Sequence, residues 1–530
     1  MSGTLARSIP FAAWSMVFAL CLATQARSET GMIELELQTR EGAADKNDAG
    51  RVVRTVEKLH PAKTAIVIVD MWDKHWCKTY TERVGNLVPR MNKTLEAARK
   101  LGIQVVHAPS DVLGPYKETP QRKAMQAIPE HPAPEHPAPE KTDFNPPDPP
   151  GGRDCCECGP SRPCQSHGAW SSEHPGLRIA EEDLIADCNN GREILNLCQD
   201  RGIDTLLYMG VASNMCLIGR SAGMIEMRRH GLRPIFVADL VEAITANGCD
   251  PATKAPDPNF TPARGTAQAQ RHLERYIAPS IQSRQIIAAA GMDPFAHDKR
   301  PHVVFVIAEQ EYGSDKTLPA FAEKYLKNDF RCSFVYAKGH EGADRNDVPG
   351  LEVLLDADLL FLSMRRRALP VTQMDRLEWY IRAGKPIVGV RVSIVPFQVD
   401  PKECPEGHVV WRDFDQEVLG CHYQGYPGQS RETGCDVWVV EEAKDHPILR
   451  GVKPTRFHSA SWLYNLYPLA DTTTLLMKGR WAEGQPEQPV AFTNTYSGAR
   501  VFYTSLGHPK DFENEAFCRM LANAVKWALQ

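Results

Sequence analysis

The sequence predicts an α/β protein with two three-layer domains, each built on a mainly parallel sheet. Short apolar runs alternate with amphipathic helical segments, which is the repeating unit of a parallel sheet. The alternation occurs twice, once up to about residue 291 and again from Pro301 onward. In addition, a chain of 530 residues is too long for one hydrophobic core, so at least two domains are expected.

The first series begins with the run Thr64–Asp70, whose continuous β-branched residues are typical of a strand buried on both faces. Asp70, Asp111 and Cys216 fall at or just beyond predicted strand ends, which is the edge where open parallel sheets place their ligands. The polar segment 28–58 is predicted to be a leader or an edge segment. The remaining elements predicted here are helices at 86–101 and 191–201, strands at 103–108, 206–209 and 234–238, and one helix that starts at Cys216 and runs past Met227.

The second series follows a boundary placed at 292–300. It contains alternating apolar and helical segments of the same kind, and it closes with a helix. Its predicted strands are 302–307, 332–336, 358–362 and 386–392, and its predicted helices are 318–326, 371–383 and 517–529.

The N-terminus has the pattern of a secretory signal peptide, which we place at residues 1–26. Arg7 supplies a positive charge, residues 9–23 are mostly apolar, and Ala23 to Ala26 offers small residues for cleavage. The alternative is a membrane anchor, but the apolar run is short and is interrupted by Pro10 and Ser15. We therefore expect a secreted or periplasmic protein. The net charge of −5 does not suggest nucleic acid as a partner.

A proline-rich and cysteine-rich insertion is predicted at 128–167. All but one of the 15 cysteines lie outside the predicted leader, and in an oxidising compartment several of them are expected to pair. Two alternatives remain open for the cluster in the insertion, a zinc site or local disulfides, although its spacing fits no standard zinc pattern. The cluster consists of Cys155, Cys156, Cys158 and Cys164, with His167 and His174 nearby.

Cys216 is the first candidate for chemistry. A thiol at the start of a helix lies in a positive field that lowers its pKa and favours the nucleophilic thiolate. The alternative is a buried core cysteine, since free cysteine packs well.

The segments Val67–Asp70 and Gly210–Cys216 resemble the isochorismatase-like cysteine hydrolases, which include nicotinamidases and N-carbamoylsarcosine amidohydrolases. The resemblance implies a domain at 55–293 that hydrolyses C–N bonds of small amides with an Asp–Lys–Cys triad. By this resemblance Cys216 is the nucleophile and Asp70 its base. A cis peptide at Val211–Ala212 would help the N–H groups of Ala212 and Cys216 form an oxyanion hole. The implied substrate pocket contains Trp72, His75, His107, Asp111 and Asn214.

Two departures from that family stand out. There is no lysine between Lys141 and Lys254, and the family's lysine corresponds to a position near Asp183, so we assign the cation to Arg178 as the nearest candidate. The family's Asp-x-His metal motif is also missing, because Val112 and Leu113 follow Asp111. At this site we therefore expect neither a metal nor a cofactor.

Residues 300–530 resemble the ThuA-like family, named for trehalose utilisation, whose fold is flavodoxin-like and similar to class I glutamine amidotransferases. The resemblance rests on segments 446–451, 458–464 and 498–508. No cysteine follows the predicted strand 386–390, so glutamine hydrolysis is disfavoured. A carbohydrate pocket is one interpretation of Arg391, His458, Trp462, Tyr464 and His508; the alternative is that Trp462 and Tyr464 are core residues.

Together these observations predict an exported hydrolase that cleaves a small amide-type C–N bond through a cysteine nucleophile. The expected partners are a small amide and a carbohydrate, and the resemblance also allows a homo-oligomer because the family often assembles. A rival of a different class is a non-catalytic secreted binding protein on the same scaffold, since fold alone does not decide function.

Overall fold

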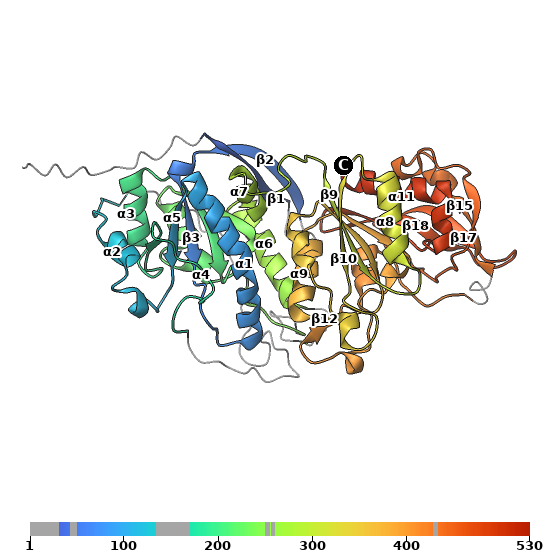
Figure 1. Cartoon of the computed structure of the whole chain (residues 1–530), viewed down its shortest axis with the longest axis horizontal. Helices are drawn as coiled ribbons and strands as arrows, with labels where there is room; N and C mark the ends of the chain where they lie inside the picture. Colours follow the sequence, from blue (N-terminus) through green and yellow to red (C-terminus); the bar gives the residue numbers. More distant parts are fainter. Residues whose placement is uncertain (1–30, 43–49, 134–169, 250–254, 256–259, 428–432) are drawn as a thin grey trace, which may run out of the picture.

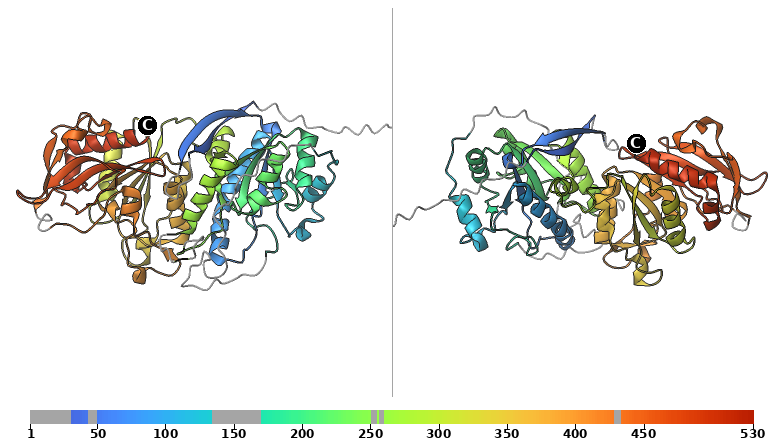
Figure 2. Two further views of the ribbon diagram at one scale, coloured as in Figure 1. Left: turned by 180° about the vertical axis from the view of Figure 1, so that it is seen from behind. Right: turned by 45° about the horizontal axis from the view of Figure 1, so that its top comes forward.

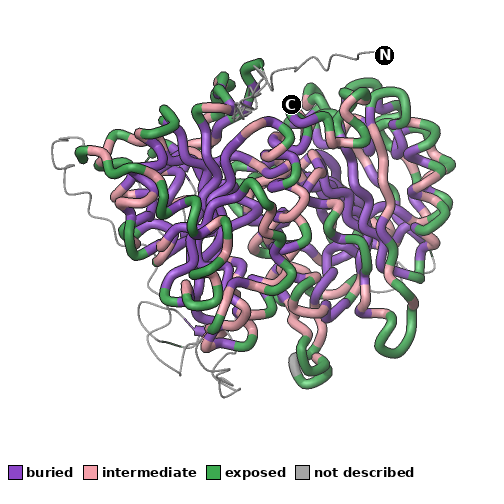
Figure 3. The backbone as a smooth tube through the Cα atoms, turned by 60° about the vertical axis from the view of Figure 1, so that its left-hand side comes forward, coloured by how far each residue is buried: buried purple, intermediate pink, exposed green. Residues whose placement is uncertain are grey.

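The computed structural model describes residues 31–42, 50–133, 170–249, 255, 260–427 and 433–530. Within them the chain forms two lobes, each with its own large sheet, and helices α6 (Pro262–Tyr276) and α9 (Val371–Arg382) lie side by side between the lobes (Figures 1 and 2). The strands in the middle of each lobe are buried, and exposed residues lie on its periphery (Figure 3). The predicted fold class is confirmed.

The first sheet has eight strands in the order β2-β1-β8-β7-β6-β3-β4-β5, and all of its pairings from β8 to β5 are parallel. Its strands are β1 (Ile33–Glu41), β2 (Arg51–Leu59), β3 (Thr64–Val69), β4 (Gln104–Ala108), β5 (Leu184–Ile185), β6 (Thr205–Val211), β7 (Arg233–Glu242) and β8 (Ser280–Ile281). Its helices are α1 (Lys78–Leu101), α2 (Pro120–Gln126), α3 (Gly191–Arg201), α4 (Cys216–Gly219), α5 (Met224–Arg229), α6 (Pro262–Tyr276) and α7 (Ser283–Ala289).

Strand β3 shows why this sheet is covered on both sides. Every residue of the strand is buried. Ile66 and Ile68 belong to the core formed with α1 and α7, whereas Val67 and Val69 belong to the core formed with α3 and α5. Because successive side chains of a strand point to opposite faces, a continuous apolar run produces a three-layer arrangement.

The order of the strands creates a switch point between β3 and β6. From β3 the chain adds β4 and β5 on one side, and then returns to add β6, β7 and β8 on the other. In an open parallel sheet, a crevice forms at the carboxyl ends of the two strands where the direction reverses. Asp70 directly follows β3, and the turn that leads to Cys216 directly follows β6.

Two elements of this lobe differ from the sequence prediction, and for a third the structure selects the second of two alternatives, an edge segment. The segment predicted as a leader or edge contains the antiparallel hairpin β1–β2, which forms one edge of the sheet. Helix α1 begins at Lys78, before the expected Asn86, and accommodates Pro89 in its interior. The single helix expected from Cys216 is instead two short helices, α4 and α5, separated at Arg220–Gly223.

The second sheet has nine strands in the order β10-β9-β11-β13-β19-β18-β17-β15-β16. The pairings from β10 to β19 are parallel, and those from β19 to β16 are antiparallel. The sequence analysis did not predict this antiparallel half of the sheet. Its strands are β9 (His302–Ala308), β10 (Arg331–Tyr336), β11 (Leu359–Met364), β13 (Ile387–Val390), β15 (Cys435–Val439), β16 (Arg456–Ser459), β17 (Thr474–Arg480), β18 (Gln488–Tyr496) and β19 (Ala499–Thr504), with a separate pair β12 (Leu369–Pro370) and β14 (His408–Val409). Its main helices are α8 (Ser314–Tyr325), α9 (Val371–Arg382) and α11 (Glu515–Ala528).

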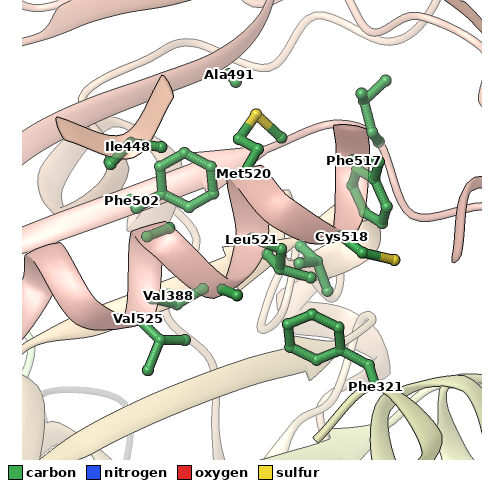
Figure 4. Packing of buried hydrophobic residues seen from close by; sticks show 14 of the residues in the cluster. Phe321, Val388, Ile448, Ala491, Phe502, Phe517, Cys518, Met520, Leu521 and Val525 are labelled. Atoms are coloured by element: carbon green, nitrogen blue, oxygen red, sulfur yellow. The ribbon is translucent and has the colours of Figure 1, made fainter. Parts of the chain in front are cut away.

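The second lobe repeats the packing of the first. Phe305 of β9 belongs to the core with α8 and α11, and its neighbour Val306 belongs to the opposite core with α9. Figure 4 shows the α11 side, where Phe517 and Leu521 pack toward Phe321 of α8 and Phe502 of β19. The closing helix is therefore an integral part of the core.

The two lobes meet through ion pairs in which the first lobe supplies arginines and the second supplies aspartates. Arg90 binds Asp356 with two hydrogen bonds of 2.6 and 3.1 Å, and Arg284 donates to Asp358 at 2.7 Å. The most buried pair joins Arg83 of α1 to Asp375 of α9 at 3.2 Å. The guanidinium of Arg83 also donates to Glu242, at the end of β7.

Several predictions fall outside the described residues. The signal peptide, the proline-rich part of the insertion and the cysteines from Cys155 to Cys164 are among them. In the part of the chain that the structure describes, no helix has the length and apolar character needed to cross a membrane.

The Arg83 contact gives a stability prediction. Arg83→Met leaves the buried Glu242 carboxylate without its cation, and removing one partner of a buried ion pair costs about 3–5 kcal/mol. We expect a clear fall in the urea midpoint of the full chain, measured by intrinsic fluorescence. The matched control is Arg519→Met, which removes a half-exposed arginine on α11 and should leave the midpoint almost unchanged. Equal midpoints for the two variants would contradict a structural role for the buried pair.

Candidate active site

Asp70 is held at the carboxyl end of β3 by the turn after β4. It is fully buried and adopts a positive φ of 47°. Ser110 donates its backbone N–H to Oδ1 of Asp70 at 2.6 Å and its hydroxyl to Oδ2 at 3.0 Å. These two bonds fix the carboxylate at the switch point of the sheet.

The turn that carries Cys216 approaches β3 closely because of Gly210. This residue has φ of 107°, and a Cβ placed on it would lie 2.1 Å from the carbonyl oxygen of Val69. Only glycine fits this approach, which brings the end of β6 against the residue that precedes Asp70. The Val211–Ala212 peptide bond that follows is cis, at the position implied by the family resemblance.

The predicted oxyanion hole uses two backbone N–H groups of this turn, those of Ala212 and Cys216. Cys216 is the first residue of α4, so its N–H has no partner within the helix. Ala212 lies just beyond the last residue of β6, and its carbonyl oxygen instead accepts the N–H groups of Met215 and Leu217. Of the two predicted donors, the N–H of Cys216 is thus outside the hydrogen-bond ladder of its helix, as an oxyanion-hole donor has to be.

The cation at the site is Arg220, not Arg178. Its Nε lies 3.9 Å from Oδ2 of Asp70, and its guanidinium is in hydrogen-bond contact with Cys216. Arg178 lies against α1, where it is exposed and its backbone N–H donates to Asn92. The assignment of Arg178 was therefore wrong, because distance along the chain was a poor guide to distance in the fold.

The break in the helix explains the position of Arg220. Helix α4 ends at Gly219, so Arg220 leaves the helix in an extended conformation and its side chain reaches back over the strand ends. It lies 3.7 Å from Asp111 and donates to Asn189 at 2.8 Å, and Asn189 in turn donates to Asp111 at 2.9 Å. Asp111 is thus half-exposed at the rim, where it orients the cation.

The protonation of the site differs from the sequence expectation. Burial, and then the charge of Asp70, raise the pKa of Cys216 to about 11, although Arg220 opposes the rise. The prediction that the start of a helix lowers the pKa of Cys216 is wrong, because α4 is only a single turn and burial outweighs its field. Burial also raises the pKa of Asp70 to about 6, although the hydrogen bonds from Ser110 lower it. At neutral pH the pair is therefore a neutral thiol beside a carboxylate.

A second cysteine, Cys188, lies next to this pair and was not predicted. It is buried, contacts the Ser110 hydroxyl and is affected by the charges of Asp70 and Cys216. Burial raises its pKa well above the usual range, so it remains a neutral thiol. It forms part of the wall behind Asp70.

The aromatic residues beside Asp70 form one wall of the site. The rings of Trp72 and Trp170 stack with centroids 3.8 Å apart, and His75 lies 5.9 Å from Trp72. Trp72 also donates its Nε1–H to the carbonyl oxygen of Ser110 at 3.3 Å. Burial lowers the pKa of His75 to about 4, so the imidazole is neutral at pH 7. Trp72 and His75 therefore lie together, and Trp72 links them to the Ser110 turn that holds Asp70.

His107 and Asn214, both predicted to line the substrate pocket, instead bind groups that hold the fold together. His107 is fully buried between Glu173 at 3.0 Å and Asp183 at 3.3 Å. Burial alone would lower its pKa, but the two carboxylates raise it to about 9. Asp183 also binds Arg99, so this network holds β4 to the segment before β5. Asn214 binds both backbone groups of Ile244 and fixes the loop after β7.

The second lobe brings together some of its predicted pocket residues. Arg391 follows β13 with φ of 48°, and its guanidinium carbon lies 4.5 Å from the rings of both Trp462 and Tyr464. The backbone N–H of His508 donates to Asp511, a buried carboxylate that also accepts the hydroxyl of Ser461. His458 instead points to solvent and pairs with Asp436 at 2.9 Å, so it is not part of this cluster.

No three His, Cys, Asp or Glu side chains are grouped as metal ligands among the residues described. What the first site offers chemically is a thiol, a carboxylate, a guanidinium and two N–H groups at one strand edge.

The raised pKa of Asp70 leads to a pH prediction. The unfolded chain ionises this carboxyl near 3.8 and the folded chain near 6, so ionisation progressively destabilises the fold between these values and the full penalty applies above them. Asp70→Asn should therefore unfold at a higher temperature than wild type at pH 7, by an amount worth on the order of 2 kcal/mol, and the gain should vanish near pH 3.5.

Asp73→Asn is the matched control for this experiment. Although burial opposes it, hydrogen bonds from Ser171 lower the pKa of Asp73, so this substitution should lose stability at neutral pH. The account of Asp70 is wrong if Asp70→Asn is destabilised at pH 7 as well.

Comparison with known proteins gives a family match for the second lobe. Residues 302–528 match the family model ThuA, described as trehalose utilisation. A putative ThuA-like protein from Parabacteroides merdae is 16% identical, with 44% of this chain and 91% of that chain covered and a TM-score of 0.32. No curated protein matches the chain in sequence.

Other solved structures similar to this chain include a cysteine hydrolase and an amidase. A cysteine hydrolase from Pseudomonas syringae pv. phaseolicola is 14% identical, covering 44% of this chain and 94% of that chain, with a TM-score of 0.28. N-carbamoylsarcosine amidase from Thermoplasma acidophilum is 17% identical, covering 42% and 96%, with a TM-score of 0.23. The family match thus covers the second lobe, at residues 302–528.

Proposed function

We propose that the protein is an exported hydrolase that cleaves a small amide-type C–N bond through Cys216. The observation that carries the proposal is the contact of Cys216 with both Asp70 and Arg220 at the switch point of the first sheet. A nucleophile, a base and a cation at one strand edge are what thiol-dependent acyl transfer requires.

In the first half of the proposed reaction, Asp70 takes the proton from Cys216 as the sulfur attacks the amide carbonyl carbon. The carbonyl oxygen becomes an oxyanion, which the N–H groups of Ala212 and Cys216 stabilise. When the tetrahedral intermediate collapses, the C–N bond breaks and protonated Asp70 gives its proton to the leaving amine. The product of this half is an acyl thioester on Cys216.

In the second half, water replaces the amine. Asp70, again ionised, takes a proton from water as the oxygen attacks the thioester carbonyl carbon. The C–S bond then breaks, the acid product leaves and the thiolate recovers the proton from Asp70. A carboxyl with a pKa of about 6 suits both directions of transfer near neutral pH.

Arg220 would replace the lysine of the related hydrolases. Its guanidinium favours the charged form of the thiol, and it lowers the pKa of both Asp70 and Cys216 relative to burial alone. Because it is also held by Asp111 and Asn189, the cation is oriented before substrate arrives.

Two features support export. One is the leader pattern at residues 1–26. The other is Cys249, which is disulfide-bonded, as cysteines outside the cytosol often are. Cys216 and Cys188 are free thiols, which a nucleophilic Cys216 requires.

We also propose that the ThuA-like domain binds a carbohydrate near Trp462. This ring is only partly buried, and Tyr312 lies 5.6 Å from it. Sugar faces stack on aromatic rings, and polar groups nearby bind their hydroxyls.

The test of the hydrolase is activity of the full chain on a panel of small primary amides and N-carbamoyl compounds. We expect Cys216→Ser to abolish turnover. Arg220→Met should lower kcat/KM about 100-fold and move the acidic limb of its pH profile, expected near 6, to higher pH, because the guanidinium no longer favours ionised Asp70.

Arg220→Lys is the conservative control, since it keeps a cation and should retain most of the activity. Turnover that survives in Cys216→Ser would exclude the thioester route. No turnover of any amide by the wild-type chain would instead favour the non-catalytic binding protein.

A further inference from the structure

The second lobe contains a buried cation without a counter-charge. Arg391 is 1% exposed, and no carboxylate pairs with it among the residues described. Its Nη1 donates to the carbonyl oxygens of Trp462 and Ser505 at 2.6 and 2.7 Å, and its Nη2 to Tyr312 at 3.3 Å. Its Nε is buried and has no hydrogen-bond partner. Buried arginines are normally paired, because desolvating an isolated charge is costly.

The position of Arg391 is one where parallel sheets bind ligands. The chain adds β10 on one side of β9 and β11 and β13 on the other, so the switch point lies between β9 and β11. Tyr312 follows β9, Arg365–Arg367 follow β11, and Arg391 follows β13. The carboxyl ends of three neighbouring strands therefore contribute to one edge.

Three successive arginines increase the positive charge at this edge. The backbone N–H groups of Arg366 and Arg367 donate to Val395 and Pro396 at 2.8 and 2.7 Å, which ties the turn after β11 to the turn after Arg391. Burial, and then the charges of Arg345 and Arg365, lower the pKa of Arg367 to about 10. The cations are thus close enough to repel one another.

The acidic groups that face the edge do not balance these cations. Glu311 pairs with Arg365 at 3.1 Å. Glu309 is buried and accepts the backbone N–H groups of Tyr312 and Ser314, each at 2.9 Å. Among the residues described, neither carboxylate pairs with Arg366 or Arg391, so these two guanidinium groups lack an acidic partner there.

Aromatic rings lie between Arg366 and Arg391, the two arginines that lack an acidic partner. Tyr464 lies 4.5 Å from the guanidinium of Arg391, and Tyr423 packs edge-on against Tyr464 at 5.3 Å. The charges of Arg365, Arg366 and Arg391 all act on the Tyr423 phenol. Arg366 is exposed and Trp462 is partly buried, so the cluster extends from the interior to the surface.

We propose that this edge is a binding site for a small anionic ligand, a carboxylated or phosphorylated sugar, whose anion is recognised by Arg366 and Arg391. The planar guanidinium fork suits carboxylate and phosphate oxygens equally. The proposal that the ligand contains a sugar depends on the carbohydrate site proposed above. The proposal that the ligand is an anion depends only on the arginines.

The test is calorimetric titration of the full chain with glucuronate, glucose 6-phosphate, glucose and inorganic phosphate. We expect one of the two charged sugars to bind at least about tenfold more tightly than glucose, as a charge-assisted contact provides. Preference between glucuronate and glucose 6-phosphate identifies the carboxylate or the phosphate as the anion. Arg366→Met should remove the preference over glucose.

Arg391→Met should weaken binding in the same way, and the exposed Arg366 keeps the test valid if that buried variant does not fold. Arg519→Met, on α11, is the control and should bind as wild type. Equal affinity for glucose and the charged sugars would overturn the anionic site but leave the carbohydrate site intact. Binding of phosphate with no binding of any sugar would support the anionic site and overturn the proposed carbohydrate site. Absence of binding by all four probes would overturn both.

Discussion

The burial of Asp70 at the end of β3 is the constraint on which the first site depends. A carboxylate in that position is expensive to ionise, and only the two bonds from Ser110, the thiol of Cys216 and the guanidinium of Arg220 offset the cost. These groups come from two separate places in the chain, the turn after β4 and the segment from Cys216 to Arg220 after β6. The fold therefore has to close around Asp70 before the thiol has a base. The same burial keeps the pKa of the carboxyl near the pH at which proton transfer is useful.

The ThuA-like domain is linked physically to that site. Asp375 of α9 contacts Arg83, and Arg83 binds Glu242 at the end of β7. The carbonyl oxygen of Glu242 accepts the N–H of Ser213, in the turn between the cis bond and Cys216. The two domains are thus not independent units joined by a tether, since a charge from one supports the backbone turn that leads to Cys216 in the other.

Much of the framework was accessible from sequence, because it follows from local patterns. The run Thr64–Val69 predicts a strand covered on both faces, and the turn Gly210–Cys216 places a thiol at the neighbouring strand end. Arg220 was missed because Leu217 to Met227 was taken as one continuous helix. A helix places residues i and i+4 on the same face, so an arginine four residues after the thiol was a usable signal. What could not be foreseen was the break at Gly219 that turns Arg220 toward Asp70.

The protonation states were also beyond the sequence, for a physical reason. A pKa depends on burial and on neighbouring charges, and these come from residues far apart in the chain, such as Ser110 and Arg220 around Asp70. The antiparallel half of the second sheet escaped prediction for a similar reason. Strands such as β15 and β17 are only partly buried, and their pairing is decided by tertiary contacts.

The central claim is that Cys216 forms an acyl thioester with the help of Asp70 and Arg220. The most direct measurement is to mix the full chain with an activated acetyl ester, quench it in acid and locate the acetyl group by peptide mass spectrometry. We predict acetylation at Cys216, slower in Arg220→Met and in Asp70→Asn, and unchanged in the distant variant Cys332→Ser. Acetylation that is absent from Cys216, or that is spread over other free cysteines at similar rates, would contradict the account.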